Sequence, residues 1–182
     1  GAGMCAEEVS NQAVTMALAL NRQVVQSTNH LRAAGTWERS QYLPIEPIDE
    51  QTLGIVGFGN IGRQVSRKLG QGWRMETLVY DPYIEPWIIK EHNVEQVFDI
   101  NDLCERSDYI IVVVPLNTET FHMIGEEQFN HMKSSAYFIN VCRGSVTDEP
   151  ALIEALRSGK IRGAGLDVFE QEPVDPGNPL LQ

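Results

Sequence analysis

Three glycines with the spacing G-x-G-x-x-G are the residues of this chain best suited to hold a ligand. Gly57, Gly59 and Gly62 follow an apolar run at 53–56 and precede a helical pattern. The first glycine permits a tight turn, the second has no Cβ to keep a phosphate away, and the third lets the helix pack on the strand. Free N–H groups at the helix start then face a pyrophosphate. Because glycine turns are common, the surrounding residues decide what this motif means.

Asp81 is the second candidate binding residue, at the end of the next predicted strand, 76–80. A carboxylate at this place can accept hydrogen bonds from both hydroxyls of an adenosine ribose, and it repels a 2′-phosphate. Together with the glycines, Asp81 predicts an NAD site that disfavours NADP. A structural glycine turn followed by a strand-end aspartate is the alternative.

Three more polar residues lie at or after the carboxyl ends of later predicted strands, where such sheets bind ligands. Arg143 follows the strand 136–141 and can grip a carboxylate with two nitrogens, or form a salt bridge with a nearby acid. Glu172 can hold a general-base histidine in place, although alone it would be a solvated loop acid. Asp167 lies inside an apolar strand end, where it can bond a nicotinamide carboxamide or a local backbone amide.

The cysteine and histidine side chains offer no clear nucleophile or base. Cys142 is expected to be a packing residue, since no histidine is near it in the sequence. The histidines are His30, His92, His122 and His131, and all fall on predicted helices or their approaches. We expect none of them at a carboxyl-end loop, and therefore only surface or structural roles.

Alternating strands and helices must position these residues. Strands are predicted at 53–57, 75–80, 94–98, 108–114, 136–141 and 163–169, with helices at 60–71, 84–92, 99–106, 126–132 and 148–158. The continuous apolar run at 108–114 is typical of a central parallel strand buried on both faces. The alternation predicts the α/β class and a Rossmann, doubly wound parallel sheet with the strand order 3-2-1-4-5-6.

Residues 5–34 are predicted to form one long helix, and 35–51 a connector that contains Pro44, with Trp37 and Tyr42 as packing anchors. The helix has two apolar stripes, Val9, Ala13, Ala17, Leu20 and Val24, and Val14, Leu18 and Val25. So wide an apolar face predicts contact with a second subunit, and hence a homodimer through the N-terminal helix. Burial in the core of the chain itself is the alternative.

Composition limits the classes of partner. The chain has 182 residues, enough for one domain, and 14 basic against 25 acidic residues give a net charge of -11. We therefore expect no nucleic-acid partner and no anionic membrane. Cys5, Cys104 and Cys142 show no zinc spacing, so we expect no metal site and a cytoplasmic location. We also expect no signal peptide and no membrane span.

Four stretches resemble the cofactor-binding domain of the D-isomer-specific 2-hydroxyacid dehydrogenases, a family with phosphoglycerate, D-lactate and glyoxylate/hydroxypyruvate enzymes and the C-terminal-binding-protein corepressors. They are G-F-G-N-I-G with Asp81, then 107–120, 140–149 and 163–173. The resemblance implies that 1–182 is an NAD-binding domain with a hinge and dimer helix at 5–34. It places the substrate domain, and a catalytic histidine beyond Glu172, outside this chain. Thr147 departs from the aliphatic residue usual in the family.

The resemblance also implies residue roles. Arg143 would bind the substrate carboxylate, and Glu172 would orient the catalytic histidine. The residues implied to line NAD are Gly57, Phe58, Gly59, Asn60, Ile61, Gly62, Asp81, Val114, Pro115, Thr120, Val141, Cys142, Arg143 and Asp167, with Asp167 at the nicotinamide end.

The implied reaction is reversible hydride transfer between NAD(H) and a 2-oxo or 2-hydroxy acid. This chain alone is expected to bind NAD(H) with little or no turnover. One alternative is a corepressor-like module that senses NAD without catalysis. A weaker one is an NAD-containing hydrolase of related fold, against which the run R-G-S-V-T-D-E, 143–149, argues.

Overall fold

The computed structural model describes residues 5–42 and 45–181. Residues 43–44 of the predicted connector, with Pro44, lie outside the described residues, as do 1–4 and 182 of the predicted domain. Six strands form one sheet in the order β3-β2-β1-β4-β5-β6, and every neighbouring pair is parallel. The strands are β1 Thr52–Val56, β2 Glu76–Tyr80, β3 Glu95–Val97, β4 Tyr109–Val112, β5 Tyr137–Asn140 and β6 Gly163–Leu166. The predicted fold class and strand order are confirmed.

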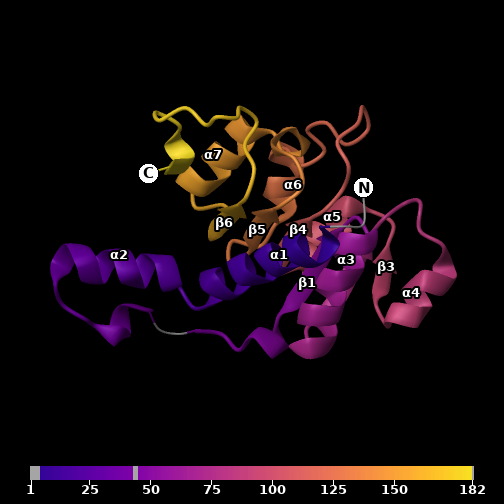
Figure 1. Cartoon of the computed structure of the whole chain (residues 1–182), viewed down its shortest axis with the longest axis horizontal. Helices are drawn as coiled ribbons and strands as arrows, with labels where there is room; N and C mark the ends of the chain where they lie inside the picture. Colours follow the sequence, from indigo (N-terminus) through magenta and orange to yellow (C-terminus); the bar gives the residue numbers. More distant parts are fainter. Residues whose placement is uncertain (1–4, 43–44, 182) are drawn as a thin grey trace.

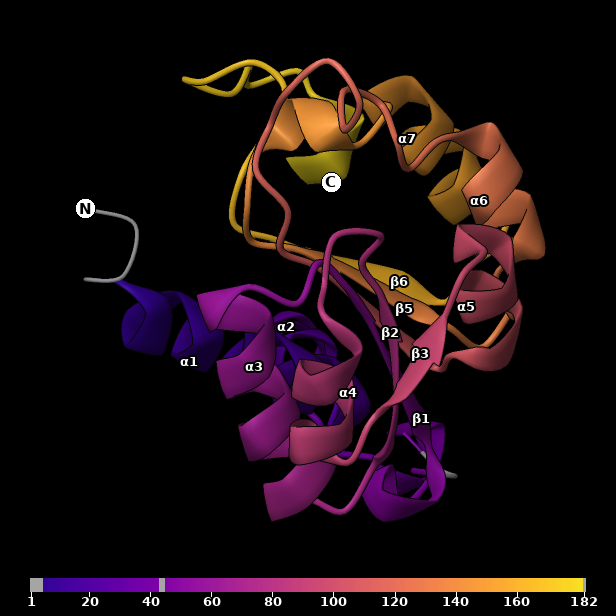
Figure 2. The ribbon, with the colours of Figure 1, turned by 90° about the vertical axis from the view of Figure 1, so that its right-hand side faces the viewer.

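Helices cover both faces of this sheet, as Figure 2 shows. They are α1 Ala6–Asn21, α2 Val24–Ala34, α3 Asn60–Val65, α4 Pro86–His92, α5 Ile100–Arg106, α6 Glu126–His131 and α7 Glu149–Arg157. Helices α1, α3 and α4 lie on one side, and α5, α6 and α7 on the other.

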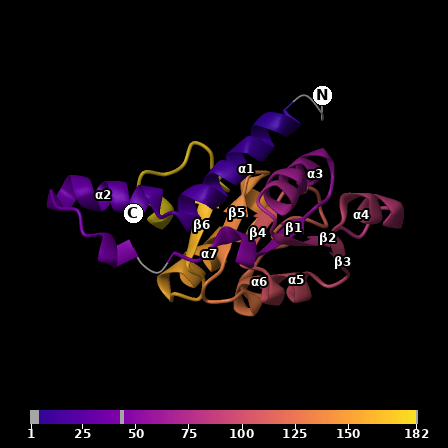
Figure 3. The same cartoon turned by 90° about the horizontal axis from the view of Figure 1, so that it is seen from below.

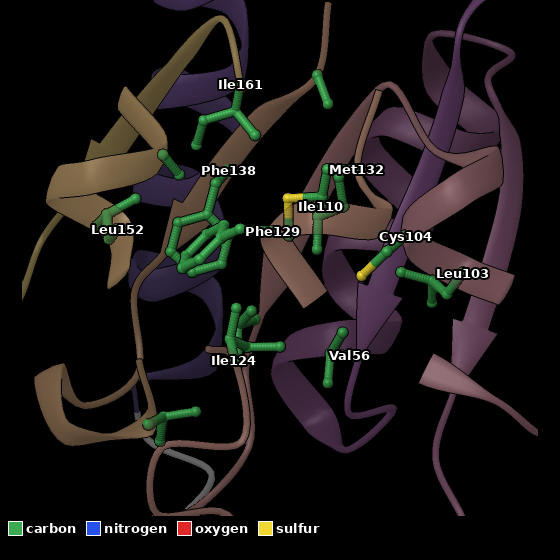
Figure 4. Close-up of a cluster of buried hydrophobic side chains, with 14 of the residues drawn as sticks. Val56, Leu103, Cys104, Ile110, Ile124, Phe129, Met132, Phe138, Leu152 and Ile161 are labelled. Atoms are coloured by element: carbon green, nitrogen blue, oxygen red, sulfur yellow. The ribbon is translucent and has the colours of Figure 1, made fainter. Parts of the chain in front are cut away.

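The alternation of side chains along β4 explains its continuous apolar sequence. Tyr109 and Ile111 belong to the core on the α1 and α3 side, whereas Ile110 and Val112 belong to the core under α5, α6 and α7. Figure 4 shows Ile110 in the second core, together with Phe138 from β5. All four β4 residues are fully buried, because a central strand faces protein on both sides.

The strands end level with one another at their carboxyl ends. Val56 of β1 is paired with Tyr80 and Val112, Val112 with Asn140, and Asn140 with Leu166. The loops after these strands therefore leave the sheet along a single edge.

The prediction of one long N-terminal helix at 5–34 is wrong in one respect. The structure has two helices there, α1 and α2, with a break between them. Gln23 has left-handed backbone angles, φ 51° and ψ 38°. Side chains on either side of the break bond the connector: Asn21 Nδ2 donates to the Glu46 carbonyl at 3.2 Å, and Gln23 Nε2 to the Tyr42 carbonyl at 3.3 Å. These contacts hold the chain in a bend that its apolar stripe did not predict.

The two halves of this segment differ in burial. In α1, Ala13 and Ala17 are fully buried, and α1 packs against α3 and across β5 and β6. Helix α2 has no buried residue and extends away from the sheet, as Figures 1 and 3 show. Val24 and Val25, the ends of the two predicted stripes, are 50% and 58% exposed.

The helix predicted at 60–71 is regular only as far as Val65. Ser66–Gly72 continues it as a π-helix, whose turns are wider. Gly70 lies close to β2, because a Cβ added there would be 2.5 Å from Oγ1 of Thr77. The remaining predicted elements are present with ends that differ by a few residues. Among residues 5–42 and 45–181, no helix has the length and hydropathy needed to cross a membrane.

Candidate functional site

The glycine turn, residues 57–62, runs from the end of β1 into the first turn of α3. It needs glycine at two positions for packing and leaves space at the third. Gly57 has φ 95°, and a Cβ there would be 2.7 Å from Cγ1 of Val114. At Gly62 a Cβ would be 2.3 Å from the carbonyl oxygen of Gly57. At Gly59, by contrast, an added Cβ meets no atom within 4 Å. The backbone at Gly59 is therefore open to a ligand, and a phosphate of NAD fits there.

Asp81 joins the glycine turn to the end of β2. Its Oδ2 accepts a hydrogen bond from the backbone N–H of Phe58 at 2.8 Å, and its Oδ1 accepts one from the N–H of Tyr83 at 3.0 Å. A carboxylate has about four acceptor sites, so ribose hydroxyls can still bond to it. Asp81 thus shapes the turn in addition to any contact with a ligand.

The switch-point cavity, about 380 Å³, lies where the loops after β1, β2 and β4 meet. It is lined by Gly57, Gly59, Tyr80, Asp81, Pro82, Tyr83, Val113, Val114, Pro115, Asn117, Glu119, Thr120 and Met123. Since β1 has β2 on one side and β4 on the other, this is the topological switch point of the sheet, where doubly wound folds bind ligands. A larger hollow lies beside the π-helix, but no residue of the glycine turn lines it. We therefore place the site in the switch-point cavity.

The cavity brings together six of the predicted cofactor residues: Gly57, Gly59, Asp81, Val114, Pro115 and Thr120. The others do not line it. Phe58, Gly62, Val141 and Cys142 are buried, Ile61 is half-buried, and Asn60, Arg143 and Asp167 are exposed.

The loop after β4 has a fixed conformation at the cavity. Oδ1 of Asn117 accepts the backbone N–H groups of Glu119 at 2.8 Å and Thr120 at 3.0 Å. The Thr120 hydroxyl donates to the Pro115 carbonyl at 2.6 Å. Asparagine and threonine side chains commonly stabilise turns in this way.

Tyr83 and Glu119 are cavity residues that sequence reasoning missed. The Tyr83 hydroxyl donates a hydrogen bond to Oε2 of Glu119, and this bond and the glutamate charge raise the pKa of Tyr83. Their only sequence signal was position: one follows the Asp81-Pro82 turn after β2, and the other lies in the stretch 114–120 after β4.

Arg143 lies beside the segment that carries Glu172 because the chain crosses itself at Gly144. A Cβ at Gly144 would be 1.9 Å from the Phe169 carbonyl oxygen, so only glycine permits the crossing. The exposed Arg143 donates from Nη1 to the Cys142 carbonyl at 2.6 Å. No carboxylate of the described residues forms an ion pair with it, which leaves most of its guanidinium donors available.

Glu172 is exposed, and its Oε1 accepts the Phe169 N–H at 3.0 Å. Nearby, two glutamates bond each other's backbone: Glu149 N–H donates to Glu170 at 3.2 Å, and Glu170 N–H donates to Glu149 at 3.0 Å. These bonds fasten the segment after β6 to the start of α7.

The expectation that no histidine lies at a carboxyl-end loop is wrong for His122. The segment 113–125 after β4 is mostly irregular, and it carries His122 to the edge where β6 ends. Nε2 of His122 lies 2.6 Å from Oε1 of Glu170, in a geometry that is not that of a hydrogen bond, and the two groups form an ion pair only when the imidazole is protonated. The position of His122, only ten residues after the end of β4, was the sequence signal that could have placed it at this edge.

Asp167 is exposed and is not inside a strand, because β6 ends at Leu166. This corrects the expected apolar setting. Its Oδ1 accepts a hydrogen bond from Nε2 of Gln12 in α1 at 3.0 Å.

The buried side chain of Asn140 forms hydrogen bonds with both Cys142 and Thr147. Oδ1 of Asn140 accepts from the Cys142 thiol at 3.2 Å, and its Nδ2 donates to Thr147 Oγ1 at 3.1 Å. Burial raises the pKa of Cys142, as expected for a packing residue. Thr147 is 3% exposed, and its bond to Asn140 explains a hydroxyl where an aliphatic residue is usual.

Comparisons with known proteins agree with this geometry. The model of the D-isomer specific 2-hydroxyacid dehydrogenase NAD binding domain matches residues 14–182. The chain is 44% identical over 178 residues to a D-3-phosphoglycerate dehydrogenase of Methanocaldococcus jannaschii, covering 97% of this chain and 33% of that one. It is 42% identical to a glyoxylate reductase of Korarchaeum cryptofilum, covering 99% of this chain and 54% of the relative. The chain thus spans about half, or less, of these relatives.

Solved structures give the same result. A D-lactate dehydrogenase of Aquifex aeolicus complexed with NAD and lactic acid superposes with a TM-score of 0.84 at 34% identity, over 92% of this chain and 49% of that one. A Granulicella formate dehydrogenase superposes with a TM-score of 0.90 at 24% identity, which supports the fold alone.

Proposed function

Because the chain belongs to the D-isomer specific 2-hydroxyacid dehydrogenase family and is its NAD-binding domain, we propose that it serves an enzyme that interconverts 2-hydroxy and 2-oxo acids. The observation that carries the proposal is the open backbone at Gly59 beside a cavity at the switch point of the sheet. Bound NAD(H) would supply or accept the hydride.

We propose the following cofactor contacts, which the family resemblance implied. Gly59 and the N–H groups at the start of α3 would hold the pyrophosphate, and Asp81 the adenosine ribose. Val114, Pro115 and Thr120 would line the dinucleotide, and Asp167 would bond the nicotinamide carboxamide. The cavity supports the roles of Gly59, Asp81, Val114, Pro115 and Thr120, which all line it. The exposed carboxylate of Asp167 supports its contact with the nicotinamide.

Arg143 would hold the substrate carboxylate and polarise the adjacent ketone. Its guanidinium is exposed, donates one hydrogen bond to the Cys142 carbonyl and has no carboxylate partner within the described chain. Arginine can therefore present paired N–H donors to an incoming carboxylate.

Glu172 would orient and tune a catalytic histidine that donates the proton. Within the described residues, the histidine at this edge is His122, which is paired with Glu170. We propose that this chain, the NAD-binding domain of a two-domain protein, binds NAD(H) without turnover at a normal rate.

We also propose a homodimer formed through α1 and α2. Helix α2 buries none of its residues, and the apolar side chains of Val24, Val25, Leu31 and Trp37 are exposed on α2 and just after it. Exposed apolar groups of this kind mark contact surfaces. Sedimentation as a monomer at micromolar concentration would reject the dimer.

The free thiols of Cys5, Cys104 and Cys142 support a reducing, cytoplasmic location.

Fluorescence titration of the chain with NADH tests the proposed binding. We expect saturable binding and no 2-oxo acid reduction by the chain alone. The full-length protein, assayed with a panel of 2-oxo acids, should oxidise NADH. A full-length protein that binds NADH tightly but is inert would instead favour the NAD-sensing module.

A further inference from the structure

The hydrogen bond between Tyr83 and Glu119 joins two loops that bound the switch-point cavity. Tyr83 follows β2, Glu119 follows β4, and both side chains line the cavity. Tyr83 is 77% exposed, so the contact contributes little to the stability of the fold. An exposed contact with no ligand role is the simplest explanation, and the charges around the cavity argue against it.

The lining of the cavity is acidic, with two carboxylates, Asp81 and Glu119, and no lysine, arginine or histidine. Sites that accept a 2′-phosphate commonly place an arginine beside it. A cavity with only negative side-chain charges repels such a phosphate more strongly than one carboxylate does.

The negative charges of Asp81 and Glu119 are offset to different degrees by hydrogen-bond donors. Asp81 accepts one backbone N–H on each oxygen, and both amides partly offset its charge. Within the described residues, the Glu119 carboxylate accepts one hydrogen bond, from the Tyr83 hydroxyl. The bonds from Asn117 to the Glu119 and Thr120 amides hold the loop in place, so the Glu119 charge stays at the cavity.

We infer that Glu119, tethered by Tyr83, is a second residue that selects NAD over NADP. This inference rests on the proposed assignment of the cavity to the adenosine end of NAD. Asp81 would bond the ribose hydroxyls, while Glu119 would act through its charge and reject a 2′-phosphate.

The test compares ADP-ribose with 2′-phospho-ADP-ribose by titration calorimetry on the chain and on Glu119→Gln. The quantity measured is the dissociation constant of 2′-phospho-ADP-ribose divided by that of ADP-ribose. Removal of one nearby charge should lower this ratio roughly three- to tenfold, because the phosphate gains affinity. The affinity for ADP-ribose should stay within about twofold, since Glu119 makes no hydrogen bond that the ribose needs.

Two further variants separate the tether from net charge. Tyr83→Phe keeps the ring and frees the carboxylate, so the ratio should fall in the same direction but by less. Glu154→Gln removes one exposed charge from α7, away from the cavity lining, and should leave the ratio unchanged.

An unchanged ratio in Glu119→Gln would overturn the inference while leaving NAD binding intact. An equal fall in Glu154→Gln would also overturn it, because net charge would then be the cause. Failure of the parent chain to bind ADP-ribose would instead reject the proposed function on which the inference depends.

Discussion

The two ends of the proposed cofactor site are built differently. At the adenosine end, loops after β1, β2 and β4 are tied to one another through Asp81 and the contact between Tyr83 and Glu119, around a formed cavity. At the nicotinamide end, Arg143, Asp167 and Glu172 are all exposed, and the side chain of each makes one hydrogen bond with the described residues.

This difference separates two tasks. Recognition of the adenosine half requires a shape that exists before the ligand arrives, since an ordered site loses less entropy on binding. Groups that act on a substrate must keep donors and acceptors available for it. In the proposed site, the cavity for the adenosine half is therefore already formed, whereas Arg143, Asp167 and Glu172 keep most of their polar atoms available for other partners.

Gly59→Ala tests the adenosine side most strongly. The added methyl meets no protein atom within 4 Å, so the melting temperature should stay close to that of the parent. The methyl would occupy the space of the phosphate and weaken NADH binding by more than about tenfold in a fluorescence titration. Gly72→Ala, in ordinary contact with its surroundings, is the matched control and should bind NADH normally. Unweakened binding by Gly59→Ala would place the phosphates elsewhere.

Asp81→Ala should have the next largest effect. It removes the acceptor of two backbone amides, so we expect a loss of about 1–3 kcal/mol in the free energy of unfolding. NADH binding should weaken and discrimination against NADPH should relax. Asp81→Asn keeps one acceptor oxygen, so this variant should lose less stability than Asp81→Ala. Both variants remove the same negative charge. If both variants keep the parent preference, the ribose role of Asp81 is wrong.

Gln12→Leu tests the nicotinamide end, where the amide of Gln12 holds Asp167. Without this bond Asp167 gains rotamer freedom, which should weaken NADH binding by roughly twofold to threefold. ADP-ribose lacks the nicotinamide, so its affinity should not change. Equal weakening of both ligands would show that α1 supports the fold and not this end of the site.

Arg143→Gln should have the smallest effect on the chain. Arg143 is exposed and has no ion pair with described residues, so stability should change by less than about 0.5 kcal/mol. NADH affinity should also stay close to the parent value. In the full-length protein, the same change should reduce kcat/KM for a 2-oxo acid strongly. A large loss of stability in the chain would mean that the arginine has a structural role.

Local sequence patterns predicted the fold and the glycine turn, because both depend on neighbours in the chain. Apolar runs marked the strands, and Gly57 to Gly62 marked the turn. The break at Gln23 depends on bonds to Tyr42 and Glu46 in the connector, which no local period contains.

The missed parts of the site also depend on distant partners. Tyr83 and Glu119 are separated by 36 positions. His122 was assigned to a helix approach, although a long irregular loop brings it to Glu170. Asp81 was identified as a ligand residue, but its bonds to the amides of Phe58 and Tyr83 were visible only in the structure.

Helix α2 has a consequence for the dynamics of the chain. It is 11 residues long and buries none of them, and helices of that length are marginal in water without tertiary packing. Its amides should exchange with deuterated solvent far faster than those of the fully buried β4 strand. If a second copy covers α2, this exchange should slow as protein concentration rises, so α2 would report the association state of the protein.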